Sequence, residues 1–392
     1  MSIPNKPSRQ LSIDAFRAIT MLLMIFVNDV SGVSNIPKWI DHVSGRADGL
    51  GFADTVFPTF LFIVGLSMPI AIGNRLKKQE SFIRIESHII LRSLALIVMG
   101  FFHVNLESYS DQAVLPHAIW ELIITISFFL IWLDYPSTVS KSLQVVFKGS
   151  GIALLILMAV LYTGEHGSGI RGMRLSWGGI LGIIGWAYLI SATLYLLIRG
   201  NLILTGVLLL LFLGINIGDH GRWLSIYIWP LGDASSVTLV MGGAFIGALY
   251  HHYRTANKLN QLWIVFALIG TGAILAGLIL RPYTDGISKI RSTPAWVLIC
   301  GGLAVIIFEL LIYLVDIKGK VKWFKWIKPA GTSTLTCYLM PYLLYSLMSL
   351  SHLWYPHWFN TGIGGILRSF VVAFVLIMVV GWMEKKHLRL KI

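Results

Sequence analysis

The chain has 392 residues, of which 56% are hydrophobic and only 12% are charged. Its mean hydropathy of +0.75 is that of an integral membrane protein and not of a soluble domain. A helix that crosses the bilayer core needs roughly 20 apolar residues, so about twelve such helices would use nearly the whole chain. These values exclude a secreted enzyme and a soluble enzyme on a single anchor. The long unbroken apolar runs also exclude an outer-membrane barrel.

Apolar segments bounded by polar, Gly or Pro stretches predict about twelve transmembrane helices. In chain order these segments are 12–29, 53–73, 88–104, 117–133, 149–163, 179–198, 201–215, 235–250, 262–280, 294–315, 329–350 and 364–383. No internal repeat or linker interrupts them, so we expect a single all-α membrane domain over residues 1–392. The start of the chain is polar and lacks a small-residue cleavage site, and we therefore predict no removable signal peptide.

The distribution of basic residues predicts the orientation. With the N-terminus in the cytoplasm, 20 of the 31 Lys and Arg residues fall on the cytoplasmic side, eight fall outside and three lie within helices. The positive-inside rule then places both termini in the cytoplasm. Topology alone explains the net charge of +13, so we expect no nucleic-acid partner. A basic inner face would also suit a polyanion such as a nucleotide cofactor.

Charged residues inside predicted helices are functional candidates, because each costs about 2.5 to 3.5 kcal/mol to insert into a bilayer. Asp14 and Arg17 lie three residues apart and therefore share one face of the first helix. They either pair locally and anchor the helix or help to hold cofactor phosphates. Glu121 and Glu309 are each expected to complete an interhelical hydrogen bond. Arg92 and Arg368 are their candidate partners, and the sequence leaves the pairing open.

The richest polar stretch, residues 28–54, lies at the predicted outer end of the first two helices. His42 is a candidate general acid or base, or an acyl acceptor, since imidazole exchanges protons near neutral pH. The alternative for a single loop histidine is an ordinary surface residue. Asp54 is read first as a helix N-cap and second as the carboxylate that orients His42. Asn28 either donates to a developing oxyanion or satisfies the helix end.

Several motifs are missing from the sequence. No P-loop, Gly-rich dinucleotide motif, G-x-S-x-G or H-E-x-x-H occurs, which weakens any prediction of ATP-driven transport, redox or protease chemistry. Cys300 and Cys337 lie in apolar runs and are read as small buried hydrophobic residues, and no metal site is expected. The glycine pairs 242–243 and 301–302 predict close helix packing.

Particular residues resemble a known family. The run LSIDAFRA at 11–18, followed by FVN at 26–28, His42 and ADTVFP at 53–58, is similar to the opening of the heparan-alpha-glucosaminide N-acetyltransferase family. The resemblance continues through the middle and late helices. It involves residues 177–188, Lys289, 315–319, 329–331 and Tyr338. The match therefore touches most of the chain, and the opening motif is its specific part.

This resemblance implies a multi-pass acetyltransferase that takes acetyl-CoA on the cytoplasmic side and N-acetylates a terminal glucosamine on the other side. The family's catalytic histidine falls on His42 and its active-site asparagine on Asn28. Asp54 would then fix the imidazole tautomer. His42 either deprotonates the acceptor amine for direct attack or carries the acetyl group itself, and the sequence leaves both mechanisms open.

The expected partners are acetyl-CoA, an amino-sugar saccharide such as a heparan-like fragment, and the lipid bilayer, with a homodimer suggested by the resemblance. The residues expected to contact acetyl-CoA are Asp14, Arg17, Arg75, Lys77 and Lys289. The short chain without a targeting extension suggests the inner membrane of a bacterium, with the acceptor in the periplasm.

The chain also departs from the family pattern. The family core has about ten helices, so the pair predicted between residues 117 and 163 is additional, and Ser333 replaces a common asparagine. These departures bear on the acceptor more than on acetyl transfer. Two alternatives stay open: an O-acetyltransferase acting on an envelope glycan, and a transporter of amino sugars or oligosaccharides.

Overall fold

The structure, a computed structural model, describes residues 10–166, 169–176, 179–224, 228–256 and 258–392. These residues form a helical bundle with one short antiparallel hairpin, β1 (Gly164–His166) and β2 (Gly169–Arg171). The α-helices are α1 (Leu11–Val30), α2 (Ala53–Lys77), α3 (Phe82–Leu106), α4 (His117–Trp132), α5 (Lys141–Val160), α6 (Ile180–Leu197), α7 (Leu202–His220), α8 (Ser235–Thr255), α9 (Leu259–Leu280), α10 (Pro294–Leu311), α11 (Lys328–Thr332), α12 (Thr334–Leu350) and α13 (Gly362–Lys385). Short 3-10 turns occupy Arg281–Tyr283 and His357–Phe359, and a π-helical turn, Ile312–Ile317, extends α10.

Each of the twelve predicted segments coincides with helix. Nine helices in the described part of the chain are long and apolar enough to cross a membrane, whereas α4 and α12 are shorter apolar helices. The prediction of one continuous helix over 329–350 is wrong, because this segment is broken into α11 and α12. Ser333 has non-helical dihedral angles at the break, and the backbone of Gly331 packs closely against the carbonyl of Asp14.

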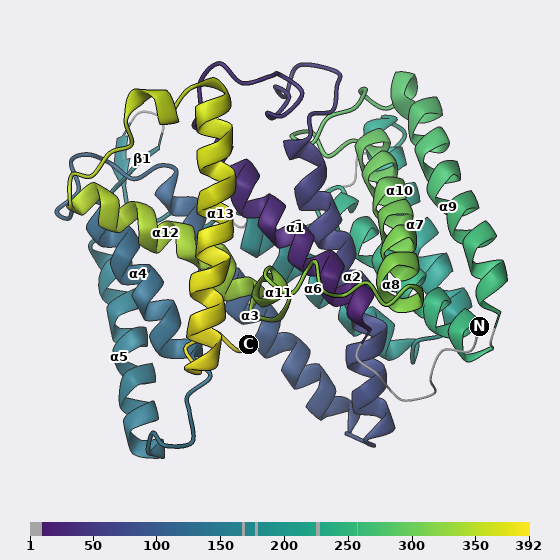
Figure 1. Cartoon of the computed structure of the whole chain (residues 1–392), viewed down its shortest axis with the longest axis horizontal. Coiled ribbons are helices and arrows are strands. Elements are labelled where there is room, and N and C mark those ends of the chain that lie inside the picture. The colour runs from purple at the N-terminus through teal and green to yellow at the C-terminus, as the bar shows by residue number, and fades with distance from the viewer. Residues whose placement is uncertain (1–9, 167–168, 177–178, 225–227, 257) are drawn as a thin grey trace.

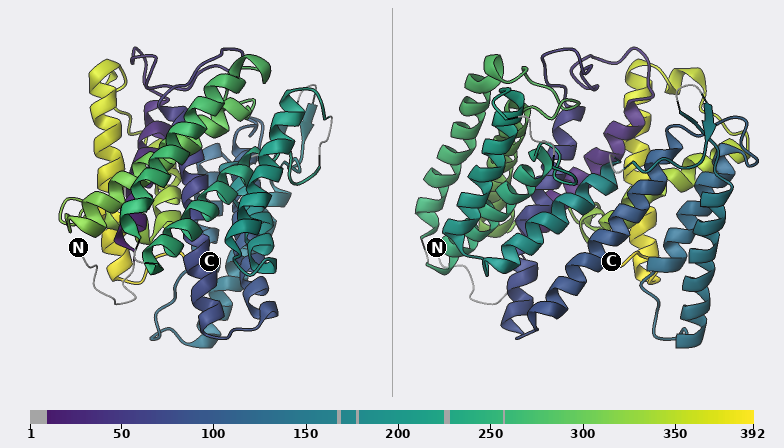
Figure 2. Two further views of the ribbon diagram at one scale, coloured as in Figure 1. Left: turned by 90° about the vertical axis from the view of Figure 1, so that its right-hand side faces the viewer. Right: turned by 180° about the vertical axis from the view of Figure 1, so that it is seen from behind.

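Helix α1 crosses the centre of the bundle, and α5, α7 and α9 lie at its periphery (Figure 1). Over its apolar stretch of 18 residues, 72% of α1 is buried inside the protein. The corresponding share is 17% for α5 and 22% for each of α7 and α9. Helices α4, α5, α12 and α13 form one side of the molecule, and α7 to α10 form the other (Figures 1 and 2). The central helices α1 and α2 are therefore shielded on both sides.

Glycines set the closest helix contacts. A Cβ added at Gly65 of α2 would lie 1.8 Å from the carbonyl oxygen of Val240, and one at Gly243 of α8 would lie 1.9 Å from that of Phe62. Within a bilayer, such close backbone approach is a main source of helix association. The predicted packing role is confirmed for Gly243 but not for its neighbour Gly242, whose added Cβ would meet only side chains at 3.8 Å or more.

The two ends of the bundle differ in what they carry. The loop of residues 31–52 and the loop of residues 281–293 lie at one end, called the loop end here (Figure 1). The beginning of α1 and the C-terminal residues lie toward the opposite end, called the terminal end (Figure 1). The polar stretch therefore lies beyond one end of α1, and the candidate cofactor residues Asp14 and Arg17 lie near the other end of that helix.

Candidate functional site

His42 and Asp54 form a hydrogen-bonded polar pair at the loop end. His42 Nδ1 lies 2.7 Å from Oδ1 of Asp54. The Asp54 side chain is only 2% exposed, whereas that of His42 is 32% exposed. A buried carboxylate thus holds the Nδ1 atom of a partly exposed imidazole.

Asp54 lies in the first turn of α2, but it does not cap that helix. The N-cap residue is Phe52, so the N-cap interpretation of Asp54 is wrong. Oδ2 of Asp54 instead accepts from the backbone N–H groups of Val43 and Gly51, at 3.0 and 3.2 Å. The carboxylate is therefore used to fold the His42 loop back onto the start of α2.

Gly51 permits this fold because a side chain there would collide with the loop backbone. A Cβ at Gly51 would lie 2.0 Å from the carbonyl oxygen of Asp41. The Asp41 carboxylate in turn accepts from the backbone N–H of His42 at 2.7 Å. Trp296 of α10 donates from its indole to the backbone carbonyl of Asp54 at 3.0 Å. Each contact fixes a neighbour of the imidazole.

Lys289 is the third ionisable side chain at this site. Its Nζ lies 3.3 Å from His42 Nδ1, although 247 residues separate the two in the chain. Burial lowers the pKa of the Lys289 ammonium, and the negative charge of Asp54 opposes that effect. Lys289 was expected among the acetyl-CoA contacts, and the structure places it at the loop end beside His42.

Two hydrogen-bonded loops bring Lys289 to His42. The carboxylate of Asp48 accepts from Arg281 Nε at 2.9 Å and from the backbone N–H of Ile287 at 2.7 Å. The backbone N–H of Gly49 donates to the carbonyl of Ile287 at 3.0 Å. The backbone hydrogen bond to Ile287 is the main reason that the pKa of Asp48 lies below its usual range, with Arg281 adding to it against the effect of burial.

Asn28 is exposed in the last turn of α1 and makes no hydrogen bond to His42 in the described part of the structure. Its neighbour Asp29 is buried and tightly held. Asp29 Oδ1 accepts from Arg368 Nη2 at 2.7 Å and from Ser369 Oγ at 2.5 Å. Arg368 therefore pairs with Asp29 and not with Glu121, which accepts instead from Ser346 of α12 as an interhelical hydrogen bond.

A cavity of about 720 Å³ lies among α1, α2, α3, α6, α11 and α12. This volume lies within the range of small-molecule sites. Its lining on α1 runs from Gln10 to Met24, which is about 21 Å of helix at 1.5 Å per residue. On α2 the lining runs from Asn74 back to Phe60. The cavity therefore extends from the terminal end of the bundle toward its middle.

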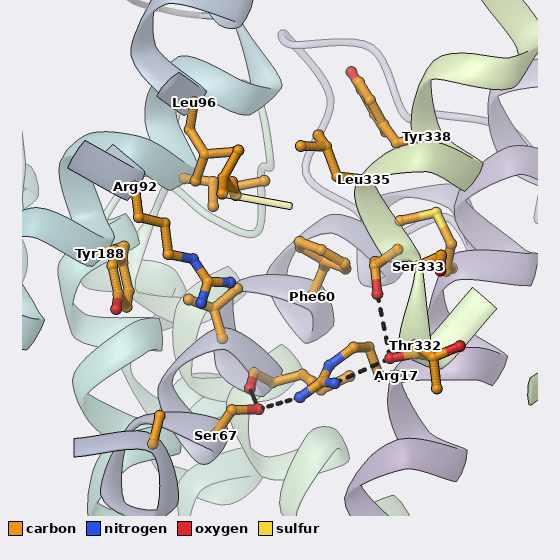
Figure 3. Close-up of a pocket in the computed structure, with 18 of the residues that line it drawn as sticks. Arg17, Phe60, Ser67, Arg92, Leu96, Tyr188, Thr332, Ser333, Leu335 and Tyr338 are labelled. Carbon is orange, nitrogen blue, oxygen red and sulfur yellow. Dashed lines mark hydrogen bonds between the residues drawn. The ribbon is translucent and has the colours of Figure 1, made fainter. Parts of the chain in front are cut away.

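Among the described residues, four cationic side chains and one carboxylate side chain line this cavity. The residues are Asp14, Arg17, Arg92, Arg389 and Lys391. Arg17 and Asp14 are 3.6 Å apart, which confirms that they share a helix face and pair. Arg17 also donates to Ser67 Oγ at 2.7 Å and to the carbonyl of Gly331 at 3.0 Å (Figure 3). Arg17 is thus a fixed positive charge in the wall.

Arg92 of α3 also lines the cavity, although the sequence did not predict it as a cofactor contact. Its guanidinium lies over the ring of Tyr188 at 5.0 Å, and both residues line the cavity wall opposite Thr332 and Ser333 (Figure 3). Its buried Nε has no hydrogen-bond partner among the described residues. The sequence marked Arg92 only as a charge in an apolar helix. Glu121, one of its two candidate partners, accepts a hydrogen bond from Ser346 of α12 instead.

The remaining expected cofactor residues lie outside this cavity. Arg75 donates to Glu80 at 2.8 Å in the turn between α2 and α3, and Lys77 is exposed at the end of α2. Neither residue lines the cavity, although Asn74 beside them does. Of the five expected contacts, Asp14 and Arg17 line it.

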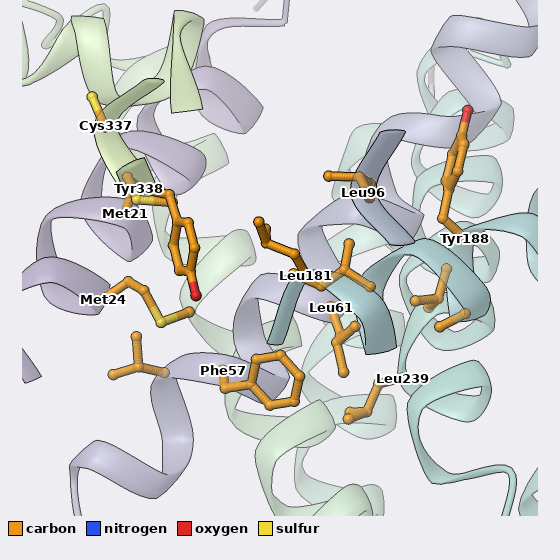
Figure 4. Packing of buried hydrophobic residues seen from close by; sticks show 14 of the residues in the cluster. Met21, Met24, Phe57, Leu61, Leu96, Leu181, Tyr188, Leu239, Cys337 and Tyr338 are labelled. Carbon is orange, nitrogen blue, oxygen red and sulfur yellow. The ribbon is translucent and has the colours of Figure 1, made fainter. Parts of the chain in front are cut away.

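A short apolar layer separates the cavity from the His42 pair. Met24 lies one turn of α1 before Asn28, and Phe57 lies one turn of α2 from both Asp54 and Phe60. Met24 and Phe57 belong to the buried hydrophobic cluster drawn in Figure 4. Roughly 6 to 9 Å of helix thus lies between the inner end of the cavity and the polar site.

Comparison with known proteins identifies the family. Residues 9–223, just over half of the chain, match the family described as Domain of unknown function (DUF5009). The chain belongs to the DUF5009 family. The matched part of this DUF5009 protein contains the His42–Asp54 pair, Arg17 and Arg92. Lys289 lies C-terminal to the matched residues.

The DUF5009 chain is also similar to two curated proteins. It is 39% identical over 99 residues to the heparan-alpha-glucosaminide N-acetyltransferase of Homo sapiens, and 34% identical over 98 residues to that of Mus musculus. Each alignment covers 25% of this chain and 14% of the relative, so the chain spans about one-seventh of the length of these relatives. The resemblance to that acetyltransferase family is confirmed over this part.

Proposed function

We propose that this protein is a membrane acetyltransferase that uses acetyl-CoA from the terminal end and N-acetylates a terminal glucosamine at the loop end. One observation carries the proposal. The same two helices, α1 and α2, line a cationic cavity at one end and hold the His42–Asp54 pair at the other. The similarity to heparan-alpha-glucosaminide N-acetyltransferases supports this choice of reaction.

His42 would act through Nε2. A carboxylate can only accept hydrogen bonds, so the Nδ1 proton of a neutral imidazole is directed to Asp54. Nε2 then carries the free lone pair that a general base or an acyl acceptor needs. Lys289 cannot donate to Nδ1 at the same time, which leaves its ammonium available to a negatively charged oxygen nearby.

The transfer is balanced with these groups. The bond between the acetyl carbon and the CoA sulfur breaks, and a bond from the acetyl carbon to the sugar nitrogen forms. One amine proton passes to His42 Nε2, and the sulfur leaves as a thiolate that takes up a proton. Lys289 and Asn28 are proposed to donate to the acetyl oxygen while it carries negative charge.

The cavity residues suit acetyl-CoA, which is an elongated molecule with a negatively charged nucleotide at one end. The buried Nε of Arg92 has no hydrogen-bond partner among the residues that the structure describes, and a phosphate oxygen is the kind of group that satisfies it. Arg17 adds a second positive charge on the facing helix. The apolar layer of Met24 and Phe57 suits the slender acyl arm and excludes the charged nucleotide. In a cell we place the terminal end in the bacterial cytoplasm, with the acceptor in the periplasm.

The proposal is tested with purified protein and radiolabelled acetyl-CoA. Native protein is expected to acetylate glucosamine, and His42→Ala is expected to lose this activity while it keeps its unfolding temperature. His357→Ala, an exposed histidine elsewhere at the loop end, serves as the matched control and should retain activity. Acetylation of sugars that lack an amine would indicate an O-acetyltransferase instead. Movement of unmodified glucosamine without acetylation would indicate a transporter.

A further inference from the structure

The last residues of the chain form a strap, defined here as residues 387–392, that lies against the end of α4. The backbone N–H of Lys391 donates to the carbonyl of Trp132 at 2.8 Å, and that of Asp134 donates to the carbonyl of Arg389 at 2.8 Å. These two bonds belong to a short antiparallel pairing between segments far apart in the chain. The strap thus has a fixed place and is attached to the connection between α4 and α5.

The pairing is reinforced by charge. Asp134 accepts from Arg389 Nε at 3.2 Å and from Lys391 Nζ at 3.1 Å. Arg389 Nη1 also donates to Glu384 at 3.0 Å. Burial acts to raise the pKa of Asp134, but the hydrogen bonds from Lys391 and Arg389 outweigh it and hold the pKa below its usual range. One carboxylate between α4 and α5 therefore holds two cations of the strap.

The strap is also part of the cavity wall. Arg389 and Lys391 both line the cavity, as does Leu390, which is buried. Asp134 and Glu384, their carboxylate partners, are not among the lining residues. Both cations thus belong to residues of the cavity wall, whereas the carboxylates that hold them do not. This arrangement is suited to a ligand that carries several negative charges.

We propose that Arg389 and Lys391 bind the phosphate groups of the acetyl-CoA nucleotide, and that the α4–α5 pair supports the strap that presents them. The inference rests on the proposed function, because acetyl-CoA is the ligand that it assigns to the cavity. It gives a role to the additional helix pair: Asp134, in the connection between α4 and α5, fixes the position of both cations. Arg389 can form paired hydrogen bonds to a phosphate, and Lys391 adds a compact charge.

The direct test compares two ligands that differ in the nucleotide. Acetyl-CoA and S-acetylpantetheine carry the same acyl arm, but only acetyl-CoA carries the nucleotide phosphates. Arg389→Gln and Lys391→Gln are each expected to weaken acetyl-CoA binding by about tenfold and to leave S-acetylpantetheine binding unchanged. Lys386→Gln, an exposed neighbour that does not line the cavity, is the matched control.

The outcomes distinguish a failure of the proposed function from a failure of the strap inference alone. If the native protein binds neither compound, the proposed function and the strap inference both fall. If it binds acetyl-CoA and both variants bind it as tightly as the native protein, only the strap inference is overturned. Equal weakening of both compounds would also overturn it, since a general loosening of the fold does not distinguish a nucleotide.

A cross-link checks that the observed strap position is the binding position. Leu133 and Leu390 face each other in the antiparallel pairing, so Leu133→Cys with Leu390→Cys places two thiols on paired residues. We expect the oxidised protein to bind acetyl-CoA as tightly as the same protein after reduction. Loss of binding on oxidation, reversed by reductant, would show that the strap must leave the wall and would overturn the inference.

Discussion

His42 Nδ1 lies 2.7 Å from Oδ1 of Asp54, twelve residues along the chain, and the same carboxylate accepts two backbone N–H groups of the loop between them. Asp54 thus does two things at once: it folds the loop and sets the direction of the imidazole. A buried carboxylate with three donors has no freedom to swing away. The orientation of His42 is therefore established before any substrate binds.

Asp54→Asn tests this orientation. An amide can present its NH₂ group to Nδ1, which would favour the tautomer with the proton on Nε2 and remove the lone pair that the reaction needs. We expect the rate of acetyl transfer to fall by about a hundredfold or more. Asp41→Asn, which keeps an acceptor for the His42 backbone, is the control and should be nearly as active as the native protein. Equal rates for Asp54→Asn and the native protein would contradict the assigned tautomer.

The pH dependence of the reaction reports on Lys289. Because burial lowers its pKa below the ordinary value of about 10.4, the ammonium is lost as the pH rises through that lower value. If the ammonium stabilises the acetyl oxygen, kcat/KM should decline on the alkaline side. Lys289→Arg stays charged throughout, so the ratio of variant to native activity should increase with pH. A ratio that is independent of pH would rule out this role of the ammonium.

The lowered pKa of Lys289 also makes the stability of the fold depend on pH. The folded protein binds fewer protons at Lys289 than the unfolded chain does, so this residue makes the free energy of unfolding increase as the pH rises toward the unfolded pKa. Lys289→Gln should therefore flatten the dependence of the unfolding temperature on pH in the alkaline range. This pH dependence of stability can be used to correct the kcat/KM values of the native protein and of Lys289→Arg for loss of folded protein.

Arg92 is expected to contribute to ligand binding and not to the stability of the fold. Its Nε is buried without a hydrogen-bond partner in the described part of the chain, and its guanidinium contacts Tyr188. Arg92→Gln should weaken acetyl-CoA binding by about tenfold with little change in unfolding temperature. Arg84→Gln, on the exposed first turn of the same helix, should bind normally. The role proposed for Arg92 would be wrong if both variants bound acetyl-CoA with native affinity.

The contact between α2 and α8 predicts a difference between two adjacent glycines. A Cβ at Gly243 would collide with the carbonyl of Phe62, whereas one at Gly242 has ordinary space. Overpacking of this kind costs about 1 to 3 kcal/mol, and more where backbone must move. Gly243→Ala should lower the unfolding temperature clearly, and Gly242→Ala should change it little. Thermal unfolding in one detergent compares them directly, and similar shifts would contradict the assigned packing.

The sequence predicted the helices well and their contacts poorly. Long apolar runs specify helices locally, so all twelve segments were found. The break at Ser333 was not, because it depends on the approach of Gly331 to α1. The pairing of His42 with Asp54 was one of two sequence interpretations, and their short separation made it accessible. The position of Lys289, 247 residues from His42, was not accessible from spacing.

The charged residues of the cavity show again that the sequence predicts local contacts but not contacts between distant helices. Arg17 could be assigned with Asp14 because residues three apart share a helix face. Arg92 and Arg368 were recognised only as charges inside apolar helices, and Glu121, a candidate partner of both, bonds instead to Ser346. Their true neighbours, Tyr188 and Asp29, come from helices that the sequence does not place side by side. The cations of the strap gave no signal beyond a basic end of the chain.

The most direct test of the central claim is acetyl transfer between two compartments. Proteoliposomes would hold radiolabelled acetyl-CoA on the side of the terminal end, fixed by antibody or protease mapping, and a glucosamine-terminated saccharide on the other side. The proposed function predicts N-acetylated saccharide on the loop side, none with His42→Ala, and no acetyl-CoA on that side. Product formed only when both substrates share one compartment, or unmodified saccharide carried across, would contradict it.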